Sequence, residues 1–142
     1  MLSVVVKNVF VGLLAVAILL SINSCSTKVA FLSSSVVPAA RGSVKVKKDN
    51  NENYHIQIQL DNLAEVKRLQ PPKQSYVVWM ESDQQAAKNI GQINSSSGML
   101  SSRLKASFET VSSTKPSKIF ITAEDDISAQ YPGQVILSTD TF

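Results

Sequence analysis

The chain has 142 residues, with 14 Lys plus Arg, 11 Asp plus Glu, one His and one Cys. This length fits one domain of ordinary size, and a single cysteine excludes a disulfide-rich scaffold. The apolar fraction of 44% excludes a disordered chain, although the first 24 residues raise it.

The N-terminal residues have the order of a secretory signal peptide. Lys7 precedes an apolar run, residues 9–20, that is shorter than the ~20 residues of a membrane-spanning helix. A small polar stretch follows, and Ile22-Asn23-Ser24-Cys25 resembles the lipobox of bacterial lipoproteins. The resemblance implies that residues 1–24 are a lipoprotein signal peptide and that Cys25 becomes an acylated N-terminus. Removal of Lys7 then lowers the formal net charge from +3 to +2.

Acyl chains on Cys25 would hold the protein on a bilayer, because each buried CH₂ group contributes about 0.8 kcal/mol. Ser26, and not Asp, follows the cysteine, which by analogy with the usual sorting rule favours the outer over the inner membrane. The absence of an acidic cluster after the cysteine favours the periplasmic leaflet. The alternative is that Cys25 is an incidental thiol beside an ordinary cleavage site.

Residues 25–41 connect this anchor to the rest of the chain. They are rich in Ser and Ala and have no sustained period, which indicates a tether leading into an irregular first strand. Their apolar residues are too numerous for a solvated linker. We therefore expect part of the segment to pack on the domain.

From residue 42 to residue 142 the apolar residues alternate between runs of turn-forming residues, which predicts an all-β domain. The predicted strands are 44–47, 54–60, 76–80, 88–94, 103–108, 119–122 and 135–137. Residues 76–80 and 119–122 are continuously apolar, as expected for central strands, and we place Trp79 in the core of the domain.

Two connections complete the pattern. Residues 48–53 predict a polar hairpin turn, and residues 61–74 predict a crossing between sheets with one helical turn before two prolines. Together the elements indicate a two-sheet antiparallel sandwich of immunoglobulin-like type with about seven strands. A small barrel is the alternative.

A set of ordered motifs also suggests a family. It consists of Tyr76-Val77-Val78-Trp79-Met80, Asn89-Ile90-Gly91, Ile119-Phe120-Ile121-Thr122-Ala123-Glu124, and Pro132-Gly133 before Val135-Ile136-Leu137. Residues 42–142 thereby resemble the extracytoplasmic C-terminal domain of anti-sigma-K-type factors. The resemblance implies a β-sandwich outside the cytoplasmic membrane, here as a stand-alone lipoprotein of the kind expected in Bacteroidetes-like bacteria. It does not imply direct binding of a sigma factor, because residues 1–8 leave no room for a cytoplasmic sigma-binding domain.

Few residues suggest chemistry, and we expect neither a cofactor nor an enzymatic activity. With His55 as the only histidine, the chain cannot assemble a cupredoxin copper site or a four-ligand zinc site. The same shortage excludes a histidine-based catalytic triad, unless His55 acts alone. Four carboxylates form a weak calcium candidate that lacks the alternating ligand spacing of a calcium loop. They are Glu124, Asp125, Asp126 and Asp140.

Four residues are candidates for a contact surface. Arg41, Lys45 and Lys47 fall on one face of a strand near Cys25, and Tyr131 lies in a predicted loop. Lysines on an outer strand discourage pairing with other sheets, and this is the first interpretation of the three cations. The second interpretation is contact with anionic headgroups or an acidic partner.

These observations favour a lipid-anchored, non-catalytic envelope module that binds a protein or surface partner. Two alternatives stay open: a sensory component of an envelope-stress or anti-sigma system, and an enzyme of unrecognised type. Export and the small net charge exclude nucleic acid as the expected partner.

Overall fold

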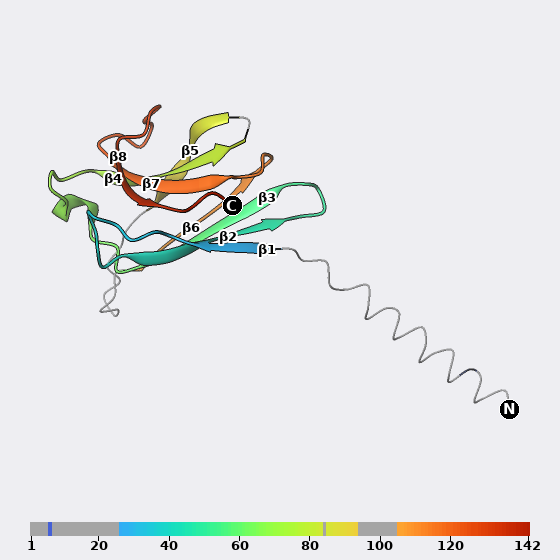
Figure 1. Ribbon diagram of the computed structural model, residues 1–142. Coiled ribbons are helices and arrows are strands. Elements are labelled where there is room, and N and C mark those ends of the chain that lie inside the picture. Colours follow the sequence, from blue (N-terminus) through green and yellow to red (C-terminus); the bar gives the residue numbers. More distant parts are fainter. Residues whose placement is uncertain (1–5, 7–25, 84, 94–104) are drawn as a thin grey trace.

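In the part of the chain that the structure describes, eight strands form two four-stranded antiparallel sheets that lie face to face (Figure 1). The computed structural model describes Val6 and residues 26–83, 85–93 and 105–142. The strand order is β1-β2-β3-β6 in the first sheet and β5-β4-β7-β8 in the second. The strands are β1 (Ser26–Ala30), β2 (Arg41–Lys48), β3 (Tyr54–Asp61), β4 (Ser75–Ser82), β5 (Gln85–Ile93), β6 (Ala106–Ser112), β7 (Lys118–Glu124) and β8 (Gln134–Ser138). The predicted all-β, two-sheet sandwich is confirmed.

The connectivity follows that of immunoglobulin-like domains. In the usual lettering, β2, β3 and β6 occupy the places of strands A, B and E, and β5, β4, β7 and β8 those of C′, C, F and G. Each of these seven strands overlaps a predicted one, although β6 extends to Ser112, beyond the predicted 103–108, and β5 begins at Gln85, before the predicted 88–94. β1 is an eighth strand, added beside β2.

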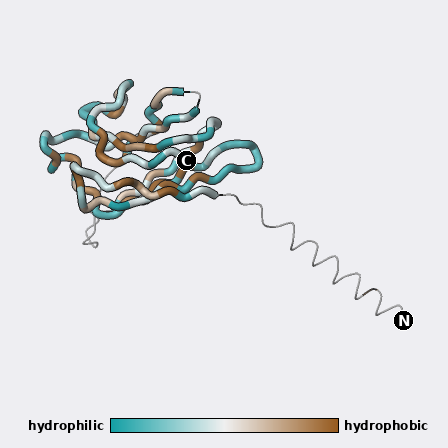
Figure 2. Tube along the Cα trace, viewed as in Figure 1, coloured by the Kyte–Doolittle hydropathy of each residue, from teal (hydrophilic) through white to brown (hydrophobic). Residues whose placement is uncertain are grey.

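The core lies between the two sheets and follows the alternation of the sequence. In β3 every second side chain is buried, while the side chains between them are exposed. The buried side chains include Val44, Val46, Ile56, Ile58 and Leu60 from the first sheet and Tyr76, Val78, Met80, Ile119 and Ile121 from the second. Figure 2 shows the corresponding hydrophobic stretches along strands of both layers. Each such side chain contributes about 1.5–3 kcal/mol by leaving water.

One glycine lets the edges of the two sheets approach each other. Gly91 in β5 has φ +140°, and a Cβ atom there would lie 2.7 Å from Cε2 of Phe108 in β6. A side chain at position 91 would thus collide with the Phe108 ring in a backbone conformation that favours glycine. The ring instead packs directly on the backbone of β5.

The segment interpreted as a tether is part of the sandwich. β1 begins at Ser26 and pairs in regular register with β2, up to Ala30 opposite Ser43. The Phe31 amide donates to the Gly42 carbonyl (3.0 Å) and the Leu32 amide to the Ser138 carbonyl (2.8 Å). The chain therefore crosses from the first sheet to the last strand of the second, and the buried side chains of Phe31, Val37 and Ala40 confirm that part of the segment packs on the domain.

The connection from β3 to β4 covers one end of the sandwich, and it contains the predicted helical turn, η1 (Val66–Arg68). Leu63, Val66 and Leu69 are buried. The Tyr76 hydroxyl donates to the Ala64 carbonyl at 2.9 Å and fixes the connection to β4.

Trp79 is fully buried, but it lies on the opposite side of the second sheet from the main core. Its neighbours are Val77 and Phe120, with Ala87 and Ala129 packed against them. The Trp79 and Phe120 rings stack with centroids 6.2 Å apart. The prediction that Trp79 is buried in the core of the domain is confirmed. It belongs to a second, smaller cluster, because Tyr76, Val78 and Met80 occupy the face of β4 that points toward the first sheet.

The connection between β7 and β8 covers this second cluster. Asn89 of β5 donates from Nδ2 to the carbonyls of Ile127 (2.9 Å) and Ala129 (3.3 Å), which holds the connection against the sheet. Asp126 Oδ1 accepts from the amide and hydroxyl of Ser128 at 2.8 and 2.7 Å. β4 is thus buried on both sides, as its apolar sequence predicts, with a loop as one of the two covers.

The buried hydrogen bond from Trp79 Nε1 to Thr122 Oγ1 (2.7 Å) generates a stability prediction. Thr122→Val leaves the indole N–H unpaired and should lower the free energy of unfolding by about 1–3 kcal/mol, against about 3–5 kcal/mol for Trp79→Ala. Denaturant titration measures both, and Thr141→Val, at an exposed position, is the control. Water-exposed fluorescence of Trp79 in the native protein would contradict the burial.

Tyr76 generates a prediction at high pH. Burial raises its pKa from 10.0 to about 12, so the fold favours the neutral phenol. The resulting stabilisation is complete below pH 10 and is lost as the pH rises through 12. Tyr76→Phe should lower the free energy of unfolding by about 1 kcal/mol at neutral pH and lose less stability than the parent at alkaline pH. Tyr131→Phe should match the parent; equal alkaline losses in parent and Tyr76→Phe would contradict the assignment.

Candidate functional site

A cluster of lysines lies on the exposed face of the first sheet, beside the start of β1. Lys28 is directly opposite Lys45 across the β1–β2 pair, and Lys47 is opposite Ser26. The alternation that buries the valines of β2 turns Lys45 and Lys47 outward. We call Lys28, Lys45 and Lys47 the lysine face.

The lysine face brings three positive charges close together. Within the described ranges, none of the three ammonium groups forms an ion pair. Asp49 pairs with Nε2 of His55 at 3.0 Å, and Glu109 accepts a hydrogen bond from Gln57 at 3.2 Å. Like charges directly opposite each other in a sheet are destabilising. The cluster is therefore suited to binding an anion.

A shallow cavity lies beside the lysine face, with a volume of about 230 Å³. Its lining consists of Lys45, Lys47, Asp49, His55 and Gln57. The space exceeds that of several water molecules, each of which occupies about 30 Å³ in the liquid. By volume the cavity has room for a phosphate-sized group, with two ammonium groups and the Asp49 carboxylate in its lining.

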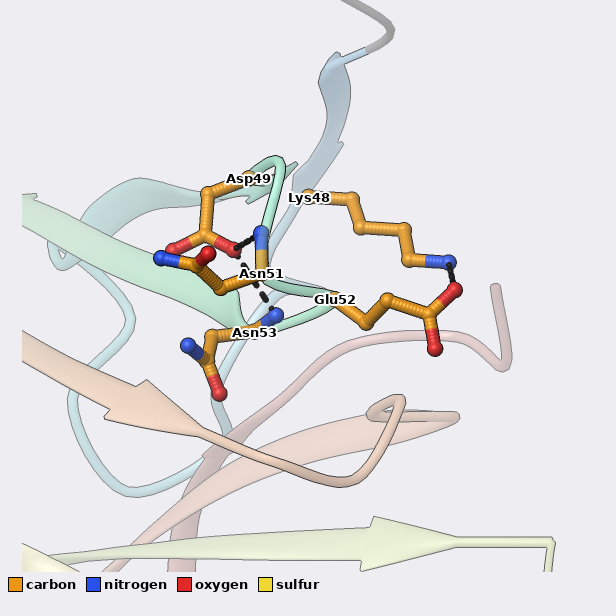
Figure 3. A network of polar contacts seen from close by, with 5 residues as sticks. All are labelled: Lys48, Asp49, Asn51, Glu52 and Asn53. Atoms are coloured by element: carbon orange, nitrogen blue, oxygen red, sulfur yellow. Dashed lines mark hydrogen bonds and ion pairs between the residues drawn. The ribbon is translucent and has the colours of Figure 1, made fainter.

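The hairpin turn between β2 and β3 holds this end of the sheet, as Figure 3 shows. Asp49 Oδ1 accepts from the amides of Asn51 (2.8 Å) and Asn53 (2.9 Å). Lys48 Nζ lies 3.1 Å from Glu52 Oε1, and Glu52 adopts a positive φ of 64°. The hairpin turn predicted at residues 48–53 is confirmed.

Hydrogen bonds within this turn shift the pKa values of Lys48 and Asp49. The bond with His55, followed by that from the Asn53 amide, lowers the pKa of Asp49. The hydrogen bond and charge of Glu52 raise the pKa of Lys48. Lys48 and Asp49 thus remain ionised at neutral pH, and Asp49 orients the His55 ring in the wall of the cavity.

The four predicted contact residues do not form one surface. Arg41 lies six residues from Lys47 along β2, a separation of about 20 Å. Its Nη1 atom donates to the carbonyls of Pro38 (2.6 Å) and Ala40 (2.7 Å), so it supports a local turn. Tyr131 is 85% exposed and follows β7 in the other sheet.

The interpretation of Lys45 and Lys47 as edge protection is wrong. β2 lies between β1 and β3, so it is an interior strand. Of the three residues in the lysine face, only Lys28 is on an edge strand. Sequence reasoning missed Lys28 because its position opposite Lys45 depends on the pairing of β1.

The carboxylates considered for calcium are separated or engaged with their own loop. Asp125 pairs with Lys73 at 2.7 Å, and Glu124 Oε1 accepts from the Gly133 amide at 2.7 Å. Asp140 follows the far end of β8. In the part of the chain that the structure describes, no three His, Cys, Asp or Glu side chains gather as a metal-binding group.

No family model matches this chain, and no curated protein or solved structure matches it. The resemblance to anti-sigma-K C-terminal domains therefore stays a prediction. Among the described residues, no helix has the length and apolar character needed to cross a membrane. The predicted signal peptide lies outside the described residues except for Val6, and Cys25 lies outside them as well.

Asp49 generates a prediction for acid conditions. Its lowered pKa means that the fold favours the carboxylate, and this stabilisation is present above pH 3.8 and is lost as the pH falls through the lowered pKa. Asp49→Ala should melt at a lower temperature than the parent at pH 7, with the difference shrinking in acid. Asp49→Asn keeps an acceptor for the turn amides and should lie between them. Equal melting temperatures of Asp49→Ala and parent at pH 7 would exclude this role.

Proposed function

We propose that this chain is a lipid-anchored, non-catalytic module of the bacterial envelope that presents a β-sandwich at a membrane surface to a protein or surface partner. The supporting observation is the position of β1, which begins at Ser26, the residue after the cysteine of the lipobox-like motif. Cleavage before Cys25 leaves all eight strands in the mature chain. The acyl chains are then attached one residue before the first strand.

This position of the anchor determines how far the domain extends from the bilayer. A flexible tether adds at most ~3.3–3.6 Å per residue between anchor and domain. Because β1 is paired with β2 from Ser26 onward, no residues are left to form such a tether between Cys25 and the domain. The module is therefore held at the level of the headgroups.

The surroundings of His55 support a non-catalytic role. A general base needs a reacting proton within about 2.6–3.2 Å and a site that orients the substrate. His55 instead lies on an open sheet face and its Nε2 atom is paired with Asp49 of the hairpin turn. The sensory alternative uses the same anchor and fold, with a membrane signalling protein as the partner.

Acylation of Cys25 is the test of this function. Cys25→Ser should abolish incorporation of radiolabelled palmitate and leave an unprocessed precursor or a protein released from the membrane, because one cysteine carries the anchor. Ser26→Ala keeps that cysteine and should incorporate the label like the parent. Density-gradient separation should place the labelled protein in the outer membrane.

A Cys25→Ser protein that is processed and still retained by the membrane would contradict the proposal that Cys25 carries the anchor. Labelling of the parent without enrichment in the outer membrane would contradict only the sorting prediction.

A further inference from the structure

We infer that the lysine face lies on the bilayer and binds the phosphate groups of anionic phospholipids, so that the first sheet of the sandwich is turned toward the membrane. The inference rests on the proposed acylation of Cys25. It adds an orientation and a ligand class to that function.

The geometry of β1 and β2 brings the three lysines close to the anchor. Lys28 is three residues from Cys25, so their Cα atoms are at most about 11 Å apart in any backbone conformation. Lys47 is opposite Ser26, and Lys45 is opposite Lys28 on the neighbouring strand. Neighbouring strands lie about 4.8 Å apart. An anchor at Cys25 therefore holds all three ammonium groups beside the headgroups.

The charge distribution indicates that this face of the sandwich contacts the membrane. At physiological ionic strength the Debye length is about 8 Å, so only cations held this near to a charged surface interact strongly with it. At the other end of β2, Arg41 is opposite Asp61 and donates to backbone carbonyls. On the lysine face itself, the nearby carboxylates of Asp49 and Glu109 bond to His55 and Gln57 without losing their charge, and the three lysines outnumber them.

An anionic surface also accounts for the cost of the cluster. Lys28 and Lys45 repel each other across the strand pair, and interior β2 needs no lysines for edge protection. Lipid phosphates would neutralise the repulsion, and the cavity beside Lys45 and Lys47 offers room for one phosphate group.

The first experiment measures the accessibility of individual lysines. The purified acylated protein is inserted into preformed vesicles of phosphatidylglycerol and phosphatidylethanolamine, or of phosphatidylcholine alone, and treated with a membrane-impermeant amine reagent. Mass spectrometry should show about tenfold less labelling of Lys28, Lys45 and Lys47 on the anionic vesicles at low salt, and high salt should restore it. Lys67 and Lys88, which are exposed and lie elsewhere, are internal controls.

The second experiment measures transfer of the protein to acceptor vesicles. The triple variant Lys28→Gln, Lys45→Gln, Lys47→Gln should leave anionic vesicles about 100-fold faster than the parent. A matched variant with Lys67→Gln, Arg68→Gln and Lys88→Gln loses the same charge away from the face and should transfer at nearly the parental rate. On phosphatidylcholine vesicles all three proteins should transfer alike.

The outcomes separate the inference from the proposed function. An acylated N-terminal peptide together with equal labelling on both vesicle types would overturn the inference and leave the anchor intact. Protection in native membranes but not on protein-free anionic vesicles would assign the face to a protein partner and would also overturn it. An N-terminal peptide without acyl mass would overturn the anchor and the inference together.

Discussion

The register of β2 on β3 determines which side chains meet the second sheet and which meet solvent. Because side chains alternate along a strand, a shift of one residue would bury Lys45 and Lys47 and expose Val44 and Val46. The turn held by Asp49 prevents such a shift, since its carboxylate binds the amides of Asn51 and Asn53. The same pairing therefore produces both the hydrophobic core and the lysine face.

The second sheet must be covered on both sides, because β4 and β7 are apolar on both faces. One face packs on the first sheet, and the other is covered by the connection from β7 to β8. Asn89 holds that connection in place by a hydrogen bond to the Ile127 carbonyl. The Trp79 indole N–H donates to the Thr122 hydroxyl oxygen. The cover makes the outer side of the second sheet a surface of loop residues, with Ile127 and Tyr131 exposed.

The two sides of the sandwich are thus chemically distinct. The side beside the proposed anchor carries the lysine face, with the exposed Val111 of β6 as an apolar residue, whereas the opposite side has Ile127 and Tyr131 exposed on a loop held by Asn89. In the proposed orientation, the lipid and the lysines fix the first side on the membrane. The second side then points away from the bilayer, where a protein partner can reach Tyr131.

The sequence by itself determined the all-β class, seven of the strands and the hairpin turn at residues 48–53, because alternation and turn-forming residues are local signals. It also indicated that β4 is buried on both sides, but tertiary structure decided which face Trp79 occupies and what covers it. The alternation of valines and lysines along β2 predicted that Lys45 and Lys47 point outward. The place of Lys28 opposite Lys45, the interior position of β2 and the separation of Arg41 from Lys47 all depend on which strands pair. Such pairing joins residues distant in the chain, and only the folded sandwich specifies it.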